Sequence, residues 1–150
     1  ERGWRRPSSG NAVVKTFFDS SAFAKRYIEE AGSEIVEKCC LQATDLALCI
    51  ICVPEILSAL NCRVRERAIS KADYGRLKHH LLEDVRDATI INLTPEVVAQ
   101  AVKTLERSPL RAADAMHIAA AEAWGADMFI SADQRQLSAA RAAGLRTKSA

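Results

Sequence analysis

Short runs of apolar and β-branched residues recur along the chain, and they predict β-strands. We expect strands at residues 13–18, 46–53, 89–93 and 127–131, with a short final strand at 145–148. The run at 46–53 (LALCIICV) is apolar at every position, as is typical of a parallel strand that is buried on both faces. The strand pattern therefore favours a parallel sheet that is covered on both sides.

Helices are predicted between these strands by apolar residues spaced three or four apart and by capping residues. Ser70 is a predicted N-cap for a helix at 71–85, and Thr94-Pro95 begins another helix with a cap followed by proline. The other predicted helices span residues 20–30, 33–42, 111–124 and 133–143, and a further helix begins at Pro54. Strands that alternate with helices predict an α/β fold, a three-layer α/β/α sandwich with a mostly parallel central sheet of four to five strands.

Length and composition favour one globular domain. The chain has 150 residues, of which 49% are hydrophobic and 27% charged. We expect residues 13–150 to form a single domain and residues 1–12 to be a tag remnant or a flexible arm. A net charge of +2 argues neither for nor against a nucleic-acid partner.

Apolar runs and cysteines bear on where the protein works. No apolar run reaches the roughly 18–20 residues that a membrane span needs, and no secretory signal pattern is visible. Five cysteines, an odd number, indicate a reducing cytoplasm. Cys49 and Cys52 form a C-x-x-C pair inside an apolar run, where we expect small hydrophobic residues and not metal ligands. We therefore expect a cytoplasmic protein with no membrane partner.

Four acidic residues lie where open α/β sheets usually bind their ligands, at the carboxyl ends of the strands. Asp19, Glu55 and Asp133 follow three predicted strands, and Asp114 begins a helix that could reach the same edge. Each has a structural alternative: a helix cap, a partner of the helix dipole or, for Asp114, an ion pair with Arg111. Together, four converging carboxylates would resist ionisation unless a divalent cation lay between them.

The acidic set predicts a particular chemistry. Mg²⁺ prefers oxygen ligands and keeps several waters, which leaves room for a phosphate oxygen and a nucleophilic water. We therefore expect metal-assisted phosphodiester hydrolysis, with four residues as catalytic and metal-binding groups: Asp19, Glu55, Asp114 and Asp133. Ser20 and Ser131 could bind a phosphate or orient a water, with helix capping as the alternative for both.

Histidine and basic residues add weaker candidates. His117 lies one helical turn after Asp114 and could face the acidic site, but packing within its alanine-rich helix is the expected role. Several basic residues could hold the phosphates of a nucleic acid, with plain solvent exposure as the alternative for each: Lys25, Arg26, Arg63, Arg111 and Arg135. No aromatic pattern of the kind that stacks RNA bases on a sheet is present.

Four segments of the chain form a recognisable set. They are VVKTFFDSSAFAKRY (13–27), VPEILSAL (53–60), LRAADAMHIAAA (110–121) and FISADQRQL (129–137). In this order and at this spacing they resemble the PIN-domain family, and in particular the VapC-like toxins of toxin–antitoxin pairs. The resemblance covers about residues 13–147 and is specific as a combination.

The resemblance implies a set of roles. Asp19, Glu55, Asp114 and Asp133 fall on the family's four acidic positions, which implies binding of Mg²⁺ or Mn²⁺ and cleavage of single-stranded regions of RNA. Asp19 and Asp114 would be the main direct ligands, while the other two would bind directly, bind through water or orient the nucleophile. Ser131 matches a small hydroxyl residue near the last acid. A homodimer and a cognate antitoxin, whose tail covers the acidic site, are also implied.

The leading hypothesis is therefore a metal-dependent endoribonuclease that serves as the toxin of a toxin–antitoxin pair. One alternative is a PIN-type nuclease in RNA processing or DNA-flap cleavage, which the short single domain disfavours. Another is a catalytically silent module that binds RNA or protein, which the complete acidic set disfavours. No motif specifies the RNA target, the number of metal ions or the identity of the antitoxin.

Overall fold

A five-stranded, wholly parallel sheet lies at the centre of the protein, in the order β3-β2-β1-β4-β5. The computed structural model describes residues 3–8 and 14–150. Its strands are β1 (Lys15–Phe18), β2 (Asp45–Cys49), β3 (Thr89–Ile91), β4 (Met128–Ser131) and β5 (Thr147–Ser149). The predicted parallel sheet of four to five strands is therefore confirmed, and β1 is its central strand.

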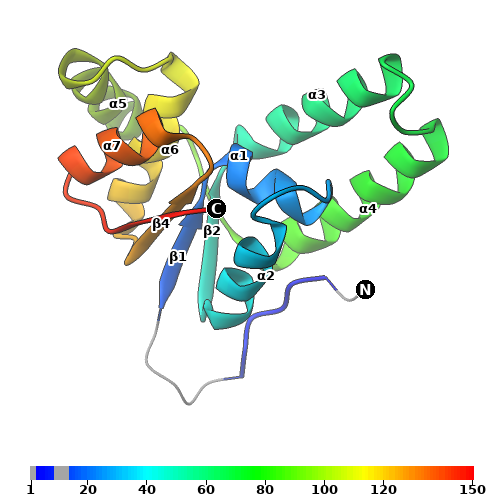
Figure 1. Ribbon diagram of the computed structural model, residues 1–150. Coiled ribbons are helices and arrows are strands. Elements are labelled where there is room, and N and C mark those ends of the chain that lie inside the picture. The colour runs from blue at the N-terminus through cyan, green and yellow to red at the C-terminus, as the bar shows by residue number, and fades with distance from the viewer. Residues whose placement is uncertain (1–2, 9–13) are drawn as a thin grey trace.

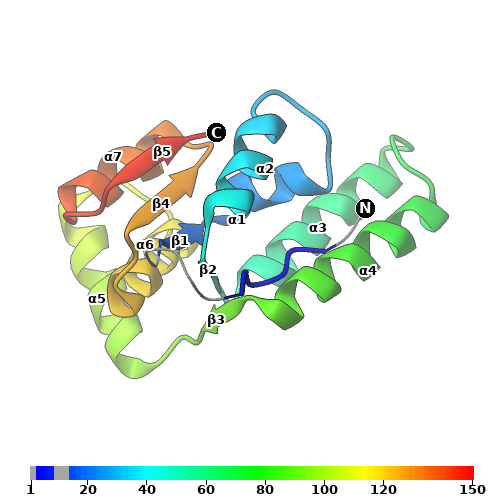
Figure 2. The same ribbon diagram turned by 90° about the horizontal axis from the view of Figure 1, so that it is seen from below.

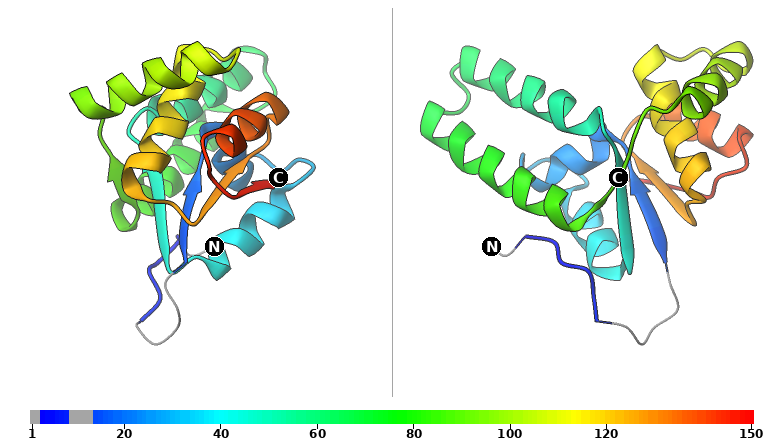
Figure 3. Two further views of the ribbon diagram at one scale, coloured as in Figure 1. Left: turned by 90° about the vertical axis from the view of Figure 1, so that its left-hand side faces the viewer. Right: turned by 180° about the vertical axis from the view of Figure 1, so that it is seen from behind.

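Helices cover both faces of this sheet. They are α1 (Ser20–Phe23), the 3-10 helix η1 (Ala24–Arg26), α2 (Ser33–Gln42), α3 (Cys52–Arg65), α4 (Lys71–Asp87), α5 (Pro95–Arg107), α6 (Ala112–Trp124) and α7 (Gln134–Ala142). Helices α1 to α4 pack on one face and α5 to α7 on the other, which confirms the three-layer α/β/α arrangement (Figures 1 and 3). Helices α3 and α4 run side by side and project away from the sheet (Figure 2).

The strand pattern explains why there are two cores. Neighbouring residues of a strand point to opposite faces of the sheet. Phe18 accordingly packs with the helices α1 to α4, whereas Phe17 packs on the α6 side and stacks on Phe129 with ring centroids 5.7 Å apart. Strands buried on both faces need apolar residues throughout, as the run at 46–53 indicates.

Capping residues define several helix ends as predicted. The Ser70 hydroxyl accepts the backbone N–H of Asp73, and the Asp73 carboxylate accepts the backbone N–H of Ser70, which completes a capping box at α4. The Thr94 hydroxyl caps α5 by accepting the backbone N–H of Val97, and Pro95 follows it. These contacts lie within one helical turn, and for that reason the sequence predicts them well.

Two predicted elements, the strand at 46–53 and the helix at 20–30, end more than two residues away from the observed ends. Strand β2 ends at Cys49 instead of residue 53, and α3 begins at Cys52, so Pro54 is its third residue. Proline is tolerated there because the amides of the first helical turn have no helical partner. The helix predicted at 20–30 is replaced by the short α1 and η1, which end at Arg26.

The N-terminal segment packs against the domain. Trp4 is only 7% exposed in the first core, where its indole N–H donates to the carbonyl of Cys40. Arg6 pairs with Asp45 at 2.8 Å. The expectation of a tag remnant or flexible arm over 1–12 stays a prediction, although the burial of the Trp4 indole removes a large apolar surface from water. Residues 1–2 and 9–13 of that prediction lie outside the described residues.

Cys49 and Cys52 are buried in the apolar interior, as the apolar run around them predicts. All five cysteines are free thiols, and four of them are buried. No helix in the described ranges combines the length and the apolar character that crossing a membrane requires.

Candidate functional site

The carboxyl ends of β2, β1 and β4 lie next to one another at one edge of the sheet, because these strands are parallel neighbours. Asp19 follows β1, the central strand, and its backbone N–H donates to the carbonyl of Ile130 in β4. Asp133 lies two residues beyond β4, and Glu55 lies in the first turn of α3. The fold thus brings three of the predicted acids to one edge.

Asp19 is a buried carboxylate that is held by neutral donors. Its side chain caps α1 by accepting the N–H of Ala22 at 2.9 Å, and it accepts the hydroxyls of Ser21 at 2.8 and 2.9 Å and of Ser131 at 2.5 Å. The residue is 1% exposed, and the described part of the chain provides no ion pair for it. Burial raises the pKa of the Asp19 carboxyl above its ordinary value, although the bonds from Ser131 and Ala22 oppose this.

Ser131 connects two of the acids. Its hydroxyl donates to Asp19 and accepts the backbone N–H of Asp133 at 3.0 Å. The Asp133 carboxylate in turn caps α7 by accepting the N–H groups of Arg135 and Gln136 at 2.9 and 3.5 Å. The cap that was an alternative for Asp133 is therefore present, and Ser131 lies between Asp133 and Asp19.

Glu55 forms a second group with Ser20 and His117. The Ser20 hydroxyl donates to Oε1 of Glu55 at 2.8 Å, and Nε2 of His117 lies 2.6 Å from the same oxygen. Burial opposes ionisation of Glu55, but the hydrogen bond and charge of His117, together with Ser20, lower its pKa overall. The Glu55 carboxylate is thereby kept ionised at neutral pH.

His117 was expected to be a packing residue, and the structure gives it a further contact. The residue is buried, as expected, but its imidazole reaches Glu55 on α3. Within the described residues its Nδ1 atom has no hydrogen-bond partner. The available signal was its position one turn after Asp114, which places both residues on one face of α6.

Asp114 lies in the first turn of α6, beside an exposed partner. Its Oδ2 is 3.5 Å from Nε of Arg111, whose side chain is 83% exposed. Exposed ion pairs of this kind contribute little to stability, so the pair leaves Asp114 available. The backbone carbonyl of Asp114 accepts the side-chain amide of Gln136 at 3.1 Å, which joins α6 to α7.

Three of the four acids lie at one edge of the sheet and Asp114 lies on α6, but the four do not form a ready cage. Serine hydroxyls link Asp19 to Asp133 and fix Glu55, while Asp114 lies one turn from His117. Among the described residues, no group of three or more His, Cys, Asp or Glu side chains surrounds a single ion position. Mg²⁺ needs only one or two carboxylates plus waters. The hard oxygen donors, and a buried Asp19 without a cationic partner, therefore fit such an ion in chemistry.

Sequence comparison identifies one family. A family model described as "PIN domain" matches residues 16–142, which is most of the chain. No curated protein gives a significant match.

Solved structures share the fold at low sequence identity. VapC20 of Mycobacterium tuberculosis, described as a sarcin-ricin loop cleaving toxin, aligns with a TM-score of 0.65 and 17% identity over 87% of this chain and 95% of that one. FitAcB of Neisseria gonorrhoeae aligns with a TM-score of 0.65 and 14% identity over 88% of this chain and 95% of that one. VapBC2 of Rickettsia felis, bound to a promoter DNA fragment, aligns with a TM-score of 0.66 and 10% identity over 90% of this chain and 98% of that one.

Proposed function

The chain belongs to the PIN-domain family, and on that premise we propose that it is a divalent-metal-dependent endoribonuclease, the toxin of a toxin–antitoxin pair. The observation that carries this proposal is Asp19. A buried carboxylate at the end of the central strand, held only by neutral donors, is costly to ionise unless a cation binds there. Such a residue is more readily explained by metal binding than by stability.

In this proposal, Mg²⁺ or Mn²⁺ is held by oxygen atoms of Asp19, Glu55, Asp114 and Asp133, directly or through water. When bound, the ion would stabilise charge on the phosphate and lower the pKa of an attacking water. Glu55, which His117 and Ser20 keep ionised, serves as a ligand or as the acceptor of a proton at its carboxylate.

The serines have positioning roles in this proposal. The sequence predicts Ser20 and Ser131 as groups that bind a phosphate or orient a water, with helix capping as the alternative. Their hydroxyl protons are instead donated to Glu55 and Asp19, so their contribution is to hold the two carboxylates in place. Ser21 does the same for Asp19, with a hydroxyl that bridges both carboxylate oxygens. A carboxylate with a fixed orientation loses less entropy when it binds an ion.

The proposal extends to partners. Proteins of similar fold include VapC20, described as a toxin, and a toxin–antitoxin complex from Klebsiella pneumoniae, which aligns with a TM-score of 0.62 and 13% identity. These descriptions support a cognate antitoxin, and we propose that it covers the acidic site. We also propose a homodimer, which light scattering of the purified chain would test.

The test is cleavage of a pool of single-stranded RNA by the purified chain, with Mg²⁺ and with a chelator. We expect Asp19→Asn to lower the rate by about 10³-fold, since losing several kcal/mol of charge stabilisation costs a factor of ten per roughly 1.4 kcal/mol. Asparagine is as good a helix cap as aspartate, so the fold should be kept. Cleavage that persists in Asp19→Asn, or with a chelator, would contradict the proposal.

Asp127→Asn is the matched control. Asp127 lies at the opposite edge of the sheet, where its carboxylate accepts the backbone N–H of Lys15. The same substitution there should leave cleavage unchanged. RNA binding without any binding of divalent ions would favour the silent-module alternative instead.

A further inference from the structure

A hollow of about 540 Å³ begins beside the acidic site and follows α3. Ser21 and Ala132 line the hollow near the acidic site. The Ser21 hydroxyl accepts the backbone N–H of Ala132 at 3.1 Å and donates to Asp19. Its lining also includes Ala24 and Ala59, whose side chains are small. The hollow is therefore continuous with the contacts that hold Asp19.

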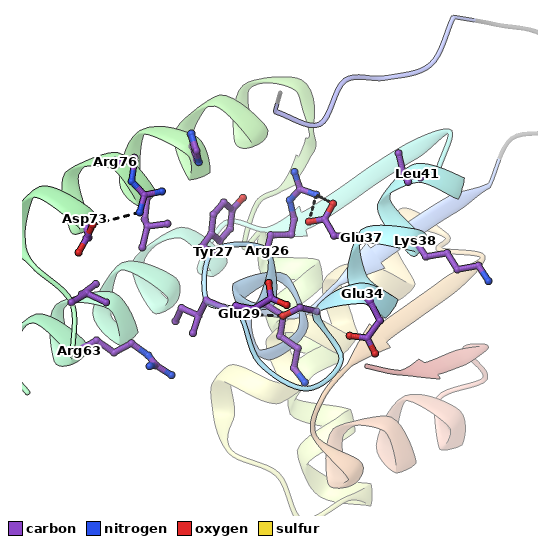
Figure 4. Close-up of a pocket in the computed structure, with 16 residues that line it drawn as sticks. Arg26, Tyr27, Glu29, Glu34, Glu37, Lys38, Leu41, Arg63, Asp73 and Arg76 are labelled. Atoms are coloured by element: carbon purple, nitrogen blue, oxygen red, sulfur yellow. Dashed lines mark hydrogen bonds and ion pairs between the residues drawn. The ribbon is translucent and has the colours of Figure 1, made fainter. Parts of the chain in front are cut away.

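Arg63 links this hollow to a larger one. The larger hollow, of about 930 Å³, lies between η1, α2 and the α3–α4 pair (Figure 4). Both hollows are lined by Lys25, Ile28 and Arg63. Because they share these lining residues, the two hollows adjoin one another beside Arg63.

One face of α3 connects an acid of the site with these hollows. Glu55, Ala59 and Arg63 are spaced four residues apart, so they lie along the same side of the helix. At a rise of about 1.5 Å per residue, Arg63 is roughly 12 Å along the axis from Glu55. The helix that supplies an acid to the site thus presents a cation a short distance away.

Two arginines around the hollows are already paired with carboxylates, whereas Lys25 contacts only carbonyl oxygens. Arg26 bonds Asp84 and Glu37, and Arg76 pairs with Asp73. The Lys25 ammonium donates to the carbonyls of Ala31 and Ala150, at 2.5 and 3.1 Å.

Arg63 differs from these neighbours. In the residues that the structure describes, its guanidinium makes no hydrogen bond and no ion pair. The smaller hollow is lined by two cations, Lys25 and Arg63, and one carboxylate, Glu30, so its lining has one net positive charge. A guanidinium binds a phosphate through two parallel hydrogen bonds, which suits a nucleic-acid backbone better than a single point charge does.

We propose that Arg63 binds a backbone phosphate that flanks the scissile one, so that single-stranded RNA runs from the acidic site over Ala59 along α3. This inference rests on the proposed nuclease function. The strand occupies the smaller hollow, whose alanine and serine walls let it approach the floor, and it leaves toward the larger one.

The test is the affinity for a fluorescent single-stranded RNA without divalent ions, measured against salt concentration. Each lost phosphate contact lowers the slope of log K against log salt by about 0.7. Arg63→Gln should show that change and weaken binding several-fold, whereas Arg63→Lys should keep most of the slope because it keeps the charge. The control is Arg65→Gln, an exposed arginine of the same helix that lines neither hollow, and its slope should equal that of the parent.

A second readout separates this inference from the proposed function. In Mg²⁺, Arg63→Gln should raise KM for RNA cleavage several-fold and leave kcat nearly unchanged. If the parent cleaves RNA but Arg63→Gln has an unaltered salt slope and KM, the phosphate site alone is overturned. The hollow would then be a candidate site for a protein partner. A parent chain that neither binds nor cleaves RNA would overturn both proposals.

Discussion

Asp19 and Asp84 are both buried carboxylates, at 1% and 2% exposure, but their surroundings differ. Asp84, on α4, accepts Nε of Arg26 at 3.1 Å, the Tyr27 hydroxyl at 2.5 Å and the backbone N–H of Trp4 at 2.5 Å. Asp19 accepts only hydroxyl and amide donors. One carboxylate has a cation supplied by the chain, and in the described residues the other has none.

The difference separates a structural acid from a functional one. Asp84 joins the N-terminal segment, η1 and α4, and its charge is balanced by Arg26, which is itself largely buried. Burial, with the charge of Asp84, raises the pKa of the Tyr27 phenol, so this hydroxyl stays a donor. At Asp19 the cost of a buried charge is only partly offset inside the described chain, by hydroxyl and amide donors and by the charge of His117. Burial alone is therefore a poor guide to function, and the charge balance around the acid is a better one.

The largest expected effect on stability is at Asp84. Asp84→Asn should lower the free energy of unfolding by about 3–5 kcal/mol, because it leaves the buried Arg26 without its partner. Asp19→Asn should change it far less, since no cation is stranded there. Urea unfolding followed by circular dichroism measures both. Glu37→Gln removes the exposed partner of Arg26 and should cost under about 1 kcal/mol. Equal losses in the two buried variants would refute the comparison.

Binding of a divalent ion should stabilise the folded chain through Asp19 and not through Asp84. Mg²⁺ at about 100 times its dissociation constant should add about 2.7 kcal/mol to the parent chain, because it binds the folded state. Thermal unfolding should show this gain in the parent and in Asp84→Asn, but not in Asp19→Asn. A gain of the same size in Asp19→Asn would place the ion elsewhere.

The smallest effect is a pH dependence in the absence of divalent ions. The pKa of Asp19 is raised on folding from its ordinary value of 3.8, so above that pH the folded chain binds more protons than the unfolded one. The stability of the parent therefore falls as pH rises through this window, and Asp19→Asn lacks that fall. The stability difference between them should be least near pH 4 and grow toward neutrality. A difference that stays constant with pH would show that Asp19 is not strained by burial.

Local sequence patterns predicted much of the fold. The caps at Ser70 and Thr94 depend on neighbours within one turn, and the structure has both. The positions of Asp19 and Asp133 after apolar strands placed them at the carboxyl edge, because parallel strands end together.

The misplaced boundaries have tertiary causes. The helix predicted at 20–30 tightens into η1, where Arg26 and Tyr27 both reach Asp84, more than fifty residues later. The docking of Trp4 depends on the same carboxylate, eighty residues away. Periodicity describes only the faces of one element, so it contains no information about such partners.

Taken alone, the sequence determined the alternation of strands and helices, the helix caps and the arrival of acids at one sheet edge, since these follow from interactions between residues close in the chain. Only the tertiary structure decided which donors hold each acid. Ser131 reaches Asp19 across 112 residues, and His117 reaches Glu55 across 62. The physical reason is that a hydrogen bond depends on distance and direction in space, which a linear pattern does not specify.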